Sequence, residues 1–492
     1  MLNRRSFLKK AGFAAVLASS GVRSQVLGAD EKSKNRKPNV VFILIDDMGW
    51  RDVGFMGSKY YETPNIDRLA SEGMVFTDAY ANAPNCAPSR ACLMSGQYSP
   101  RHGVYTVAPS ARGKSIYRKI VPTPTKRVLD PAIPTLAEAL KPAGYVSASM
   151  GKWHLGNDPQ AGPVAQGFDL NVGGFQAGHP KSYFSPYRNP ELEDGPRGEY
   201  LTDRLTDEAL KFIETNKDRP FFLYLPHYAV HTPLQAKKQM IEKYKNKEPD
   251  GGQNNSTYAA MVESTDKGVG RIMDKLAELG IEDETIVVFF SDNGGHGGVT
   301  DNSPLRGSKG MLYEGGIREP LIVKWPGKVK AGSNCDVPVI GTDFYPTLLE
   351  ACGAKKPAGH VLDGESIVKL LEGGKMLERK AVFWHFPAYL GGYKPSQGVW
   401  RTVPGGAVRV GDWKLIEFFD DGHVELYNLK EDIGETNDLA RKMPEKAKEL
   451  HGILKKWQAE VDAPIPTEKN PRFDKEKFDH KDNQLKARAK QR

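Results

Sequence analysis

The sequence predicts an α/β protein: a large, mostly parallel mixed sheet sandwiched by helices, followed by a smaller C-terminal α+β subdomain with an antiparallel sheet. Two observations lead to this prediction. Strands and helices alternate along residues 38–375, whereas beyond about residue 375 short strands follow one another before a single helix. The 492 residues, 39% of them hydrophobic, are enough for a large core and a second, smaller unit.

Apolar runs mark the inner strands of the first unit. N-V-V-F-I-L-I (39–45) and T-I-V-V-F-F-S (285–291) are bounded by polar residues and glycine, which is typical of parallel strands covered on both faces. Residues 145–150 and 221–225 are predicted as further strands. Helices are predicted from Thr63-Pro64 to Gly73, from Pro134-Thr135 to near Gly144, and over residues 258–279.

The second unit, residues 376–465, is predicted from four short strands and one helix. Asp421-Gly422 is expected to be a hairpin turn between the last two strands, and residues 444–461 have the pattern of an amphipathic helix. Residues 466–492 are charged and poor in apolar groups, so a disordered tail is predicted there. The strands are predicted over residues 381–384, 407–410, 413–418 and 423–427.

The net charge of +8 does not indicate a nucleic-acid-binding protein. Residues 1–37 carry a net charge of +7 and residues 466–492 carry +4, which leaves −3 for residues 38–465. A mildly acidic body lacks the basic face of a protein that binds phosphate backbones, so no nucleic-acid partner is expected.

The N-terminal segment, residues 1–29, is predicted to be an export signal. N-R-R-S-F-L-K-K (3–10) is close to a twin-arginine signal, and the apolar residues 11–20 are too few for a permanent membrane anchor. We therefore expect recognition by the twin-arginine export machinery, cleavage between Ser20 and Ala29, and a periplasmic or secreted bacterial protein. A disordered basic tail is the alternative.

Two polar pairs directly follow the strands at 39–45 and 285–291. Asp46-Asp47 and Asp292-Asn293 are expected at the same sheet edge, because the carboxyl ends of parallel strands meet there. Carboxylate and amide oxygens favour a hard divalent cation, and this loose ligand set suits calcium better than magnesium. Taken singly, an Asp-Asp pair after a strand is typical of a turn or a helix cap.

Residues 86–96, C-A-P-S-R-A-C-L-M-S-G, resemble the maturation and active-site motif of the type I, formylglycine-dependent sulfatases of the alkaline-phosphatase superfamily. For Cys86 alone, the alternative is a buried small hydrophobic residue. G-Y-V-S-A-S-M-G-K-W-H (144–154) and E-L-Y-N-L (425–429) extend the resemblance, which covers about residues 38–465.

The resemblance implies that a formylglycine-generating maturation enzyme oxidises Cys86 to Cα-formylglycine, whose hydrate is the nucleophile. A serine would be left as a stable sulfate ester, whereas a geminal diol expels sulfate as it re-forms the aldehyde. One Ca²⁺ would polarise the sulfate oxygens. The implied metal ligands are Asp46, Asp47, residue 86, Asp292 and Asn293.

The resemblance also assigns roles to the other polar residues of these motifs. For each lysine or histidine alone, a surface or structural role is the alternative. The implied roles are sulfate binding by Lys152 and Lys309, activation of the hydrate by Asp292, support of formylglycine by Arg90, elimination aided by His154, and protonation of the leaving group by His231.

The implied function is hydrolysis of sulfate esters on a sulfated polysaccharide or oligosaccharide. Residues 173–187 resemble carbohydrate-active members. A galactose or N-acetylgalactosamine 4-sulfate is the expected substrate. Two functions remain as alternatives: a phosphonate or phosphodiester hydrolase with the same nucleophile, and a glycan-binding protein in which Cys86 never matures. Candidate sugar contacts lie in two loops, with ordinary packed loops as the alternative, and are His179, Arg188, His385 and Arg401.

Four cysteines are few for a protein of an oxidising compartment. Three remain once Cys86 is converted, so at most one internal disulfide is possible. Cys335 and Cys352 are the candidate pair, with Cys92 left over.

Overall fold

Eight strands form the large sheet, in the spatial order β5 (Leu170–Val172), β4 (Val146–Met150), β6 (Phe221–Pro226), β1 (Asn39–Ile45), β7 (Thr285–Ser291), β8 (Leu321–Lys324), β2 (Met74–Phe76) and β9 (Ser333–Cys335). Within this sheet only β8 runs antiparallel to its neighbours. The computed structural model describes residues 36–490, and the predicted export signal lies outside them. The predicted mostly parallel sheet is confirmed.

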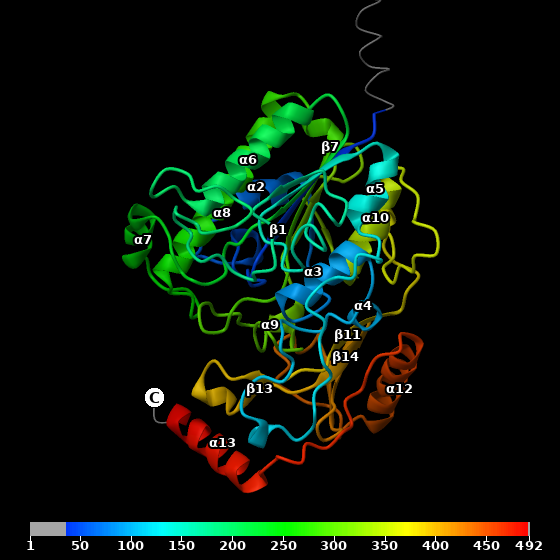
Figure 1. Cartoon of the computed structure of the whole chain (residues 1–492). Helices are drawn as coiled ribbons and strands as arrows, with labels where there is room; N and C mark the ends of the chain where they lie inside the picture. Colours follow the sequence, from blue (N-terminus) through cyan, green and yellow to red (C-terminus); the bar gives the residue numbers. More distant parts are fainter. Residues whose placement is uncertain (1–35, 491–492) are drawn as a thin grey trace, which may run out of the picture. The chain divides into compact units, whose positions relative to one another are not determined.

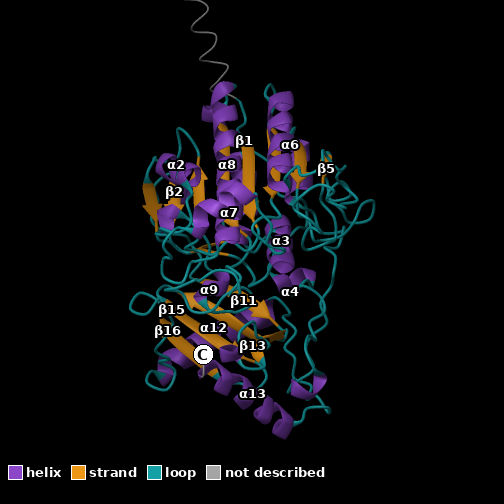
Figure 2. Ribbon diagram, turned by 90° about the vertical axis from the view of Figure 1, so that its left-hand side faces the viewer, coloured by secondary structure: helices purple, strands orange, loops and turns teal. Residues whose placement is uncertain are grey.

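Helices cover both faces of the sheet (Figures 1 and 2). Alternate residues of β1 enter two separate cores, Val41 and Ile43 on one face and Phe42 and Leu44 on the other. On the first face lie α2 (Pro64–Glu72), α6 (Leu201–Asn216), α7 (Lys238–Lys245) and α8 (Ser256–Glu278), and on the second α3 (Cys86–Ser95), α5 (Leu136–Leu140), α10 (Phe344–Ala351) and α11 (Val368–Leu371). Among the described helices, none has the length and apolar character needed to cross a membrane.

Local signals in the sequence account for the helix ends. Thr135 and Glu138 form a reciprocal capping box at the start of α5, and Pro64 occupies the first turn of α2. Gly144 adopts a left-handed conformation after the last turn of the α5 segment. The predicted helix positions are therefore confirmed.

The C-terminal sheet is antiparallel throughout, in the order β11 (Ala381–Phe386), β14 (Gly405–Val410), β15 (Trp413–Phe418) and β16 (Val424–Asn428). The helix α12 (Pro444–Glu460) packs on it, and the rings of Phe383 and Trp457 stack at 4.7 Å. Gly422 has a φ of 76° in the turn between β15 and β16, as the hairpin prediction requires.

The prediction of a disordered tail is wrong for most of residues 466–492, because residues 475–490 form the helix α13 (Lys475–Lys490). Phe478 packs near Tyr117, with 6.5 Å between ring centroids, and also contacts Phe473. The composition of the tail predicted disorder because it does not reveal the apolar partner Tyr117, which lies more than 300 positions earlier in the chain.

The candidate pair Cys335 and Cys352 is not joined by a disulfide. Both side chains are buried in the core on the α3 side of the sheet. Cys352 lies against the hydroxyl of Tyr145 and helps to raise the pKa of that phenol, after the larger effect of burial. Each cysteine therefore serves as a small core residue.

A buried ion cluster joins the two sheets. The Nζ atom of Lys414, on β15, lies 2.8 Å from Glu314 Oε1 and 2.9 Å from Glu435 Oε1, and all three side chains are fully buried. Glu314 begins the short helix α9 (Glu314–Ile317), which belongs to the first unit. Because desolvation is costly, each of these charges depends on its partners.

We predict that Lys414→Ala lowers the free energy of unfolding by about 3–5 kcal/mol, because two buried carboxylates lose their shared cation. Urea denaturation followed by tryptophan fluorescence measures this loss. Lys430→Ala, at an exposed position shortly after β16, serves as the control and should leave the midpoint unchanged. An equal midpoint for both variants would contradict the role of Lys414.

Candidate active site

Four neighbouring strands deliver polar residues to one edge of the large sheet. β4, β6, β1 and β7 are adjacent and parallel, so their carboxyl ends lie together. The segments 305–318 and α3 complete the cluster. The predicted residues that meet here are Asp46, Asp47, Cys86, Arg90, Lys152, His154, His231, Asp292, Asn293 and Lys309.

Three buried carboxylates of this cluster each pair with a cation from a different segment. All six side chains are at most 10% exposed. The pairs are Lys152 Nζ with Asp46 Oδ2 at 2.7 Å, Lys309 Nζ with Asp47 Oδ1 at 2.7 Å, and Arg90 Nε with Asp292 Oδ2 at 2.8 Å.

The carboxylates of Asp46 and Asp47 differ in their affinity for a proton. Burial raises the pKa of Asp46 to about 8, and repulsion from Asp292 and Asp47 adds to this effect while Lys152 opposes it. Burial also acts on Asp47, but Lys309 and His231 hold its pKa below the usual value. One more positive charge near Asp46 would therefore stabilise its anionic form.

Two oxygen atoms in the cluster lack a hydrogen-bond partner. Asp46 Oδ1 and Asn293 Oδ1 are both buried, while Asn293 Nδ2 donates to Asp47 Oδ1 at 2.8 Å. Ligand atoms of Asp46, Cys86 and Asp292 lie within 4.8 Å of one another. Oxygen atoms without partners beside converging carboxylates fit a hard divalent cation.

Cys86 is the first residue of α3, so the positive end of the helix dipole lies at its side chain. Its Sγ atom is 3.4 Å from His154 Nδ1. Arg90, one turn further along, donates from its guanidinium to the carbonyl oxygen of Lys152 at 2.6 Å. Negative charge that develops on residue 86 would therefore be stabilised from two directions.

A tight turn after β4 positions Lys152 and His154. Gly151 has a φ of +125°, and a Cβ atom there would lie 2.1 Å from the carbonyl oxygen of Pro226, so only glycine fits. Burial, followed by the charges of Lys152 and Arg90, lowers the pKa of His154 well below its ordinary value. His154 is therefore neutral at neutral pH.

His231 reaches the cluster from the loop after β6. Its Nε2 atom lies 3.6 Å from Asp47 Oδ2, and its Nδ1 atom lies 2.7 Å from the carbonyl oxygen of Thr232, so Nδ1 carries the hydrogen in the neutral ring. Burial, followed by the charge of Lys309, lowers the pKa of His231. The ring of His179 stacks on it at 6.1 Å, which places His179 at the edge of the site.

The segment 389–402 adds an aromatic and cationic group beside Lys309. Arg401 Nε donates to the carbonyl oxygen of Lys309 at 3.2 Å, and the guanidinium lies over the Tyr393 ring at 3.8 Å. The ring of His296 lies 4.0 Å from Tyr393. Sequence reasoning missed His296, although it directly follows Asp292-Asn293-Gly294-Gly295 and could have been found from that position.

Two of the four predicted sugar contacts do not reach this cluster. The prediction of His385 as a sugar contact is wrong, because this residue lies on β11 with 2% exposure and its ring packs against Tyr105 and Phe419. Burial also lowers the pKa of His385 to about 3. Arg188 is exposed in a turn where its backbone N–H donates to Asp194, which lies outside the cluster. The strand face and the turn geometry that decide these positions were not evident from the sequence.

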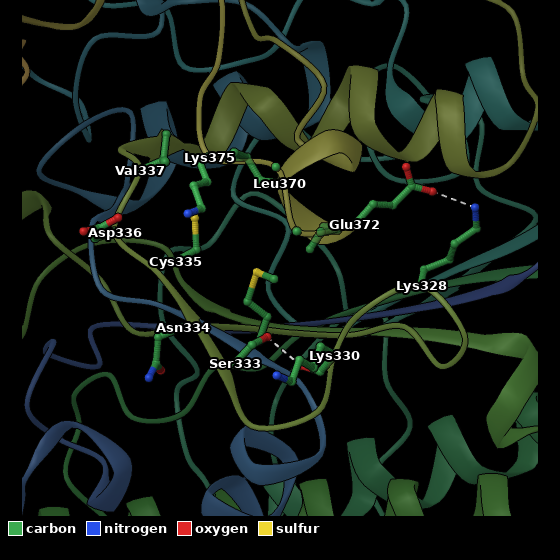
Figure 3. A pocket seen from close by; sticks show the side chains of 14 residues that line it. Lys328, Lys330, Ser333, Asn334, Cys335, Asp336, Val337, Leu370, Glu372 and Lys375 are labelled. Atoms are coloured by element: carbon green, nitrogen blue, oxygen red, sulfur yellow. Dashed lines mark hydrogen bonds and ion pairs between the residues drawn. The ribbon is translucent and has the colours of Figure 1, made fainter.

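A separate pocket of about 660 Å³ lies beside the edge strand β9 (Figure 3). In Figure 3, Lys375 extends toward Cys335, and Lys328 pairs with Glu372 at 2.6 Å. None of the residues of the charged cluster lines this pocket. This pocket is therefore separate from the charged cluster at the carboxyl edge of the sheet.

Two family models together match all of residues 38–461. The model described as Sulfatase matches residues 38–354, and the model described as N-sulphoglucosamine sulphohydrolase, C-terminal, matches residues 308–461. A relative from Formosa agariphila named Sulfatase is 35% identical, covering 88% of this chain and 91% of its own length. The N-acetylgalactosamine-6-sulfatase of Mus musculus is 35% identical over 74% of this chain and 73% of its own.

Solved structures with a similar fold were also found. The structure described as Ps i-CgsB in complex with k-i-k-neocarrahexaose has a TM-score of 0.73 and 32% identity, covering 86% of this chain and 93% of its own. The phosphonate monoester hydrolase of Agrobacterium radiobacter has a TM-score of 0.66 and 20% identity, covering 86% and 96%. At that identity the second likeness shows a shared fold alone.

The site predicts how two variants differ in cation binding. Asp292→Ala should weaken calcium binding by at least about tenfold, because it removes a carboxylate at the converging oxygens. Lys309→Ala should retain calcium binding, since it removes the ammonium group that pairs with Asp47.

The affinity for calcium should also rise with pH up to about 8, because Asp46 must lose its proton before it can bind a cation.

Isothermal titration with calcium at several pH values measures both effects. Lys328→Ala, at the separate pocket, is a matched control for the loss of a lysine. Equal loss of calcium binding in Asp292→Ala and Lys309→Ala would contradict this division of roles.

Proposed function

Since the chain belongs to the sulfatase family and hydrolyses sulfate esters, we propose that it acts on a sulfated glycan with formylglycine made from Cys86 and one bound calcium ion. The observation that supports this proposal is the set of three carboxylates and three cations buried around Cys86 at one sheet edge. This set offers oxygen ligands to a cation and ammonium groups to a sulfate within the same cluster.

The two groups that the family implies fit the residues present. Asp46, Asp47, residue 86, Asp292 and Asn293 would hold calcium, which supplies polarisation of the sulfate oxygens. Formylglycine at position 86 supplies a geminal diol as nucleophile, next to His154 and at the start of α3.

The remaining side chains bind the sulfate and move protons. Lys152 and Lys309 direct their ammonium groups into the cluster and would bind sulfate oxygens there. His231 faces the cluster with Nε2, from which a proton can pass to the leaving oxygen once the ring is protonated. Neutral His154, beside residue 86, can accept a proton from the second hydroxyl.

Sugar recognition is assigned to the side chains around this cluster. His179 stacks on His231, and Arg401 contacts the backbone of Lys309, so both border the sulfate-binding residues. His296 and Tyr393 extend this border with an imidazole and an aromatic face. His296 Nδ1 accepts the N–H of Gly298 at 3.1 Å, so its Nε2–H is available to a sugar hydroxyl.

N-acetylgalactosamine or galactose is the proposed sugar. The name of the Mus musculus relative includes N-acetylgalactosamine, which supports one of the two sugars expected from the sequence. That name states the 6-sulfate, whereas the sequence suggested the 4-sulfate. Parallel assays on 4-O- and 6-O-sulfated N-acetylgalactosamine oligosaccharides decide the position.

Export and maturation complete the proposal. The motif Asn3–Lys10 supports transport by the twin-arginine machinery into the periplasm or beyond. This machinery carries folded proteins, so a formylglycine-generating enzyme would convert Cys86 before export.

We predict that Cys86→Ala abolishes sulfate ester hydrolysis and leaves the fold intact, because it removes the precursor of the nucleophile. Cys86→Ser should also be inactive in a host whose maturation enzyme oxidises only cysteine. Cys92→Ala, six residues along α3, is the matched control and should remain active. Turnover of 4-nitrophenyl sulfate and mass spectrometry of the residue-86 peptide measure these outcomes, and substantial turnover by Cys86→Ala would refute the mechanism.

A second prediction separates sugar from sulfate recognition. Arg401→Ala and His179→Ala should lower kcat/KM on a sulfated N-acetylgalactosamine oligosaccharide by about tenfold, the loss expected for one charged hydrogen bond. Turnover of 4-nitrophenyl sulfate should fall much less, because that substrate does not reach these side chains. Arg188→Ala is the control, and equal losses on both substrates would assign Arg401 and His179 to stability.

A further inference from the structure

The C-terminal segment 466–490 lies beyond residue 461, where the matched C-terminal family model ends. We propose that this segment is a clasp that fixes the loop 389–402 at the mouth of the active site and so sets selectivity for glycans over small sulfate esters. This inference rests on the sugar-binding role proposed above for Tyr393 and Arg401.

The first anchor of the clasp is Asp482 on α13. Its Oδ1 atom accepts the backbone N–H of Val399 at 2.8 Å, and its side chain is also paired with Lys486 at 2.7 Å. Gly398 has a φ of +68°, and a Cβ atom there would lie 2.0 Å from Asp482 Oδ1. The loop therefore approaches α13 closely at Gly398, where a side chain would not fit.

The second anchor holds another loop, residues 108–120. Asn470 Nδ2 donates to the carbonyl oxygens of Ser115 and Arg118, each at 2.8 Å. The backbone N–H of Asp474 donates to the carbonyl oxygen of Ile116 at 2.9 Å. Together with the packing of Phe478 near Tyr117, these bonds fix the clasp against the body of the enzyme.

The two anchored loops also contact each other. Trp400 Nε1 donates to the carbonyl oxygen of Tyr117 at 3.0 Å, and its ring lies 4.9 Å from that of Tyr389. Asp482 accepts the backbone N–H of Val399, and Arg401, two residues further along the chain, contacts the backbone of Lys309. The position of α13 is thereby transmitted to a side chain beside the sulfate-binding lysine.

Holding the loop before substrate arrives reduces the entropy that binding must overcome. A glycan that contacts Tyr393 and Arg401 gains from this preorganisation, whereas an aryl sulfate that contacts only the charged cluster does not. Loss of the clasp should therefore raise KM for the glycan and leave turnover of the aryl sulfate unchanged.

The test uses the full-length mature enzyme with Asp482→Ala, the conservative Asp482→Asn, and the control Asp479→Ala. Asp479 lies half-buried on the same helix and pairs with Lys475 within it. In Asp482→Ala, hydrogen exchange of residues 389–402 should accelerate by about threefold to tenfold, the range for one lost hydrogen bond. KM for a sulfated N-acetylgalactosamine oligosaccharide should rise by a similar factor, whereas kcat/KM for 4-nitrophenyl sulfate should stay constant. In Asp482→Asn, the exchange rate and the glycan KM should both equal those of the unsubstituted enzyme.

Unchanged exchange of residues 389–402 in Asp482→Ala would overturn the clasp. Faster exchange with an unchanged glycan KM would overturn its role in selectivity. Arg401→Ala then separates the two proposals: if it still impairs glycan hydrolysis, the sugar-binding role stands without the clasp, and if it does not, the sugar-binding role fails as well.

Discussion

The buried charge cluster at the carboxyl edge of the large sheet is the constraint on which the rest of the site depends. Removing an unpaired charge from water costs several kcal/mol, so Asp46, Asp47 and Asp292 require Lys152, Lys309 and Arg90. Even so, burial favours the protonated form of Asp46. A divalent cation would stabilise all three carboxylates as anions, and the cluster would then carry two excess positive charges. Such an excess favours the negative charge that develops as sulfate leaves.

The fold is arranged so that this cluster can form. The two partners of each pair come from different segments, so the pairs exist only when the ends of β4, β1 and β7 lie together with α3 and the segment 305–318. The C-terminal sheet contributes at a distance. Lys414 holds Glu314, which lies five residues after Lys309 in the same segment, so packing between the two sheets also helps to position Lys309.

The sequence was sufficient to predict the cluster because Asp46, Lys152 and Asp292 closely follow strands, where position along the chain determines position in space. The resemblance to the sulfatases supplied the members that lie on α3 and in the segment 305–318. The mouth of the site was harder to predict. His385 lies on a strand whose buried face depends on packing against Phe419, and His296 becomes relevant only because Tyr393 packs on it. The tail was misread as disordered because Asp482 and Phe478 find their partners in loops far away in the sequence.

This difference in predictability follows from a physical division within the enzyme. The charged cluster is built on strand ends whose geometry the whole sheet maintains, so we expect changes there to disturb stability, activity and the proposed metal site together. The surrounding loops touch this cluster sparingly: Arg401 contacts Lys309 only through a backbone carbonyl oxygen. Substitutions in the loops or in α13 can therefore change which sugar is accepted while the charge pairs remain intact. Selectivity is thus free to vary at the mouth of the site because the chemistry does not depend on the side chains found there.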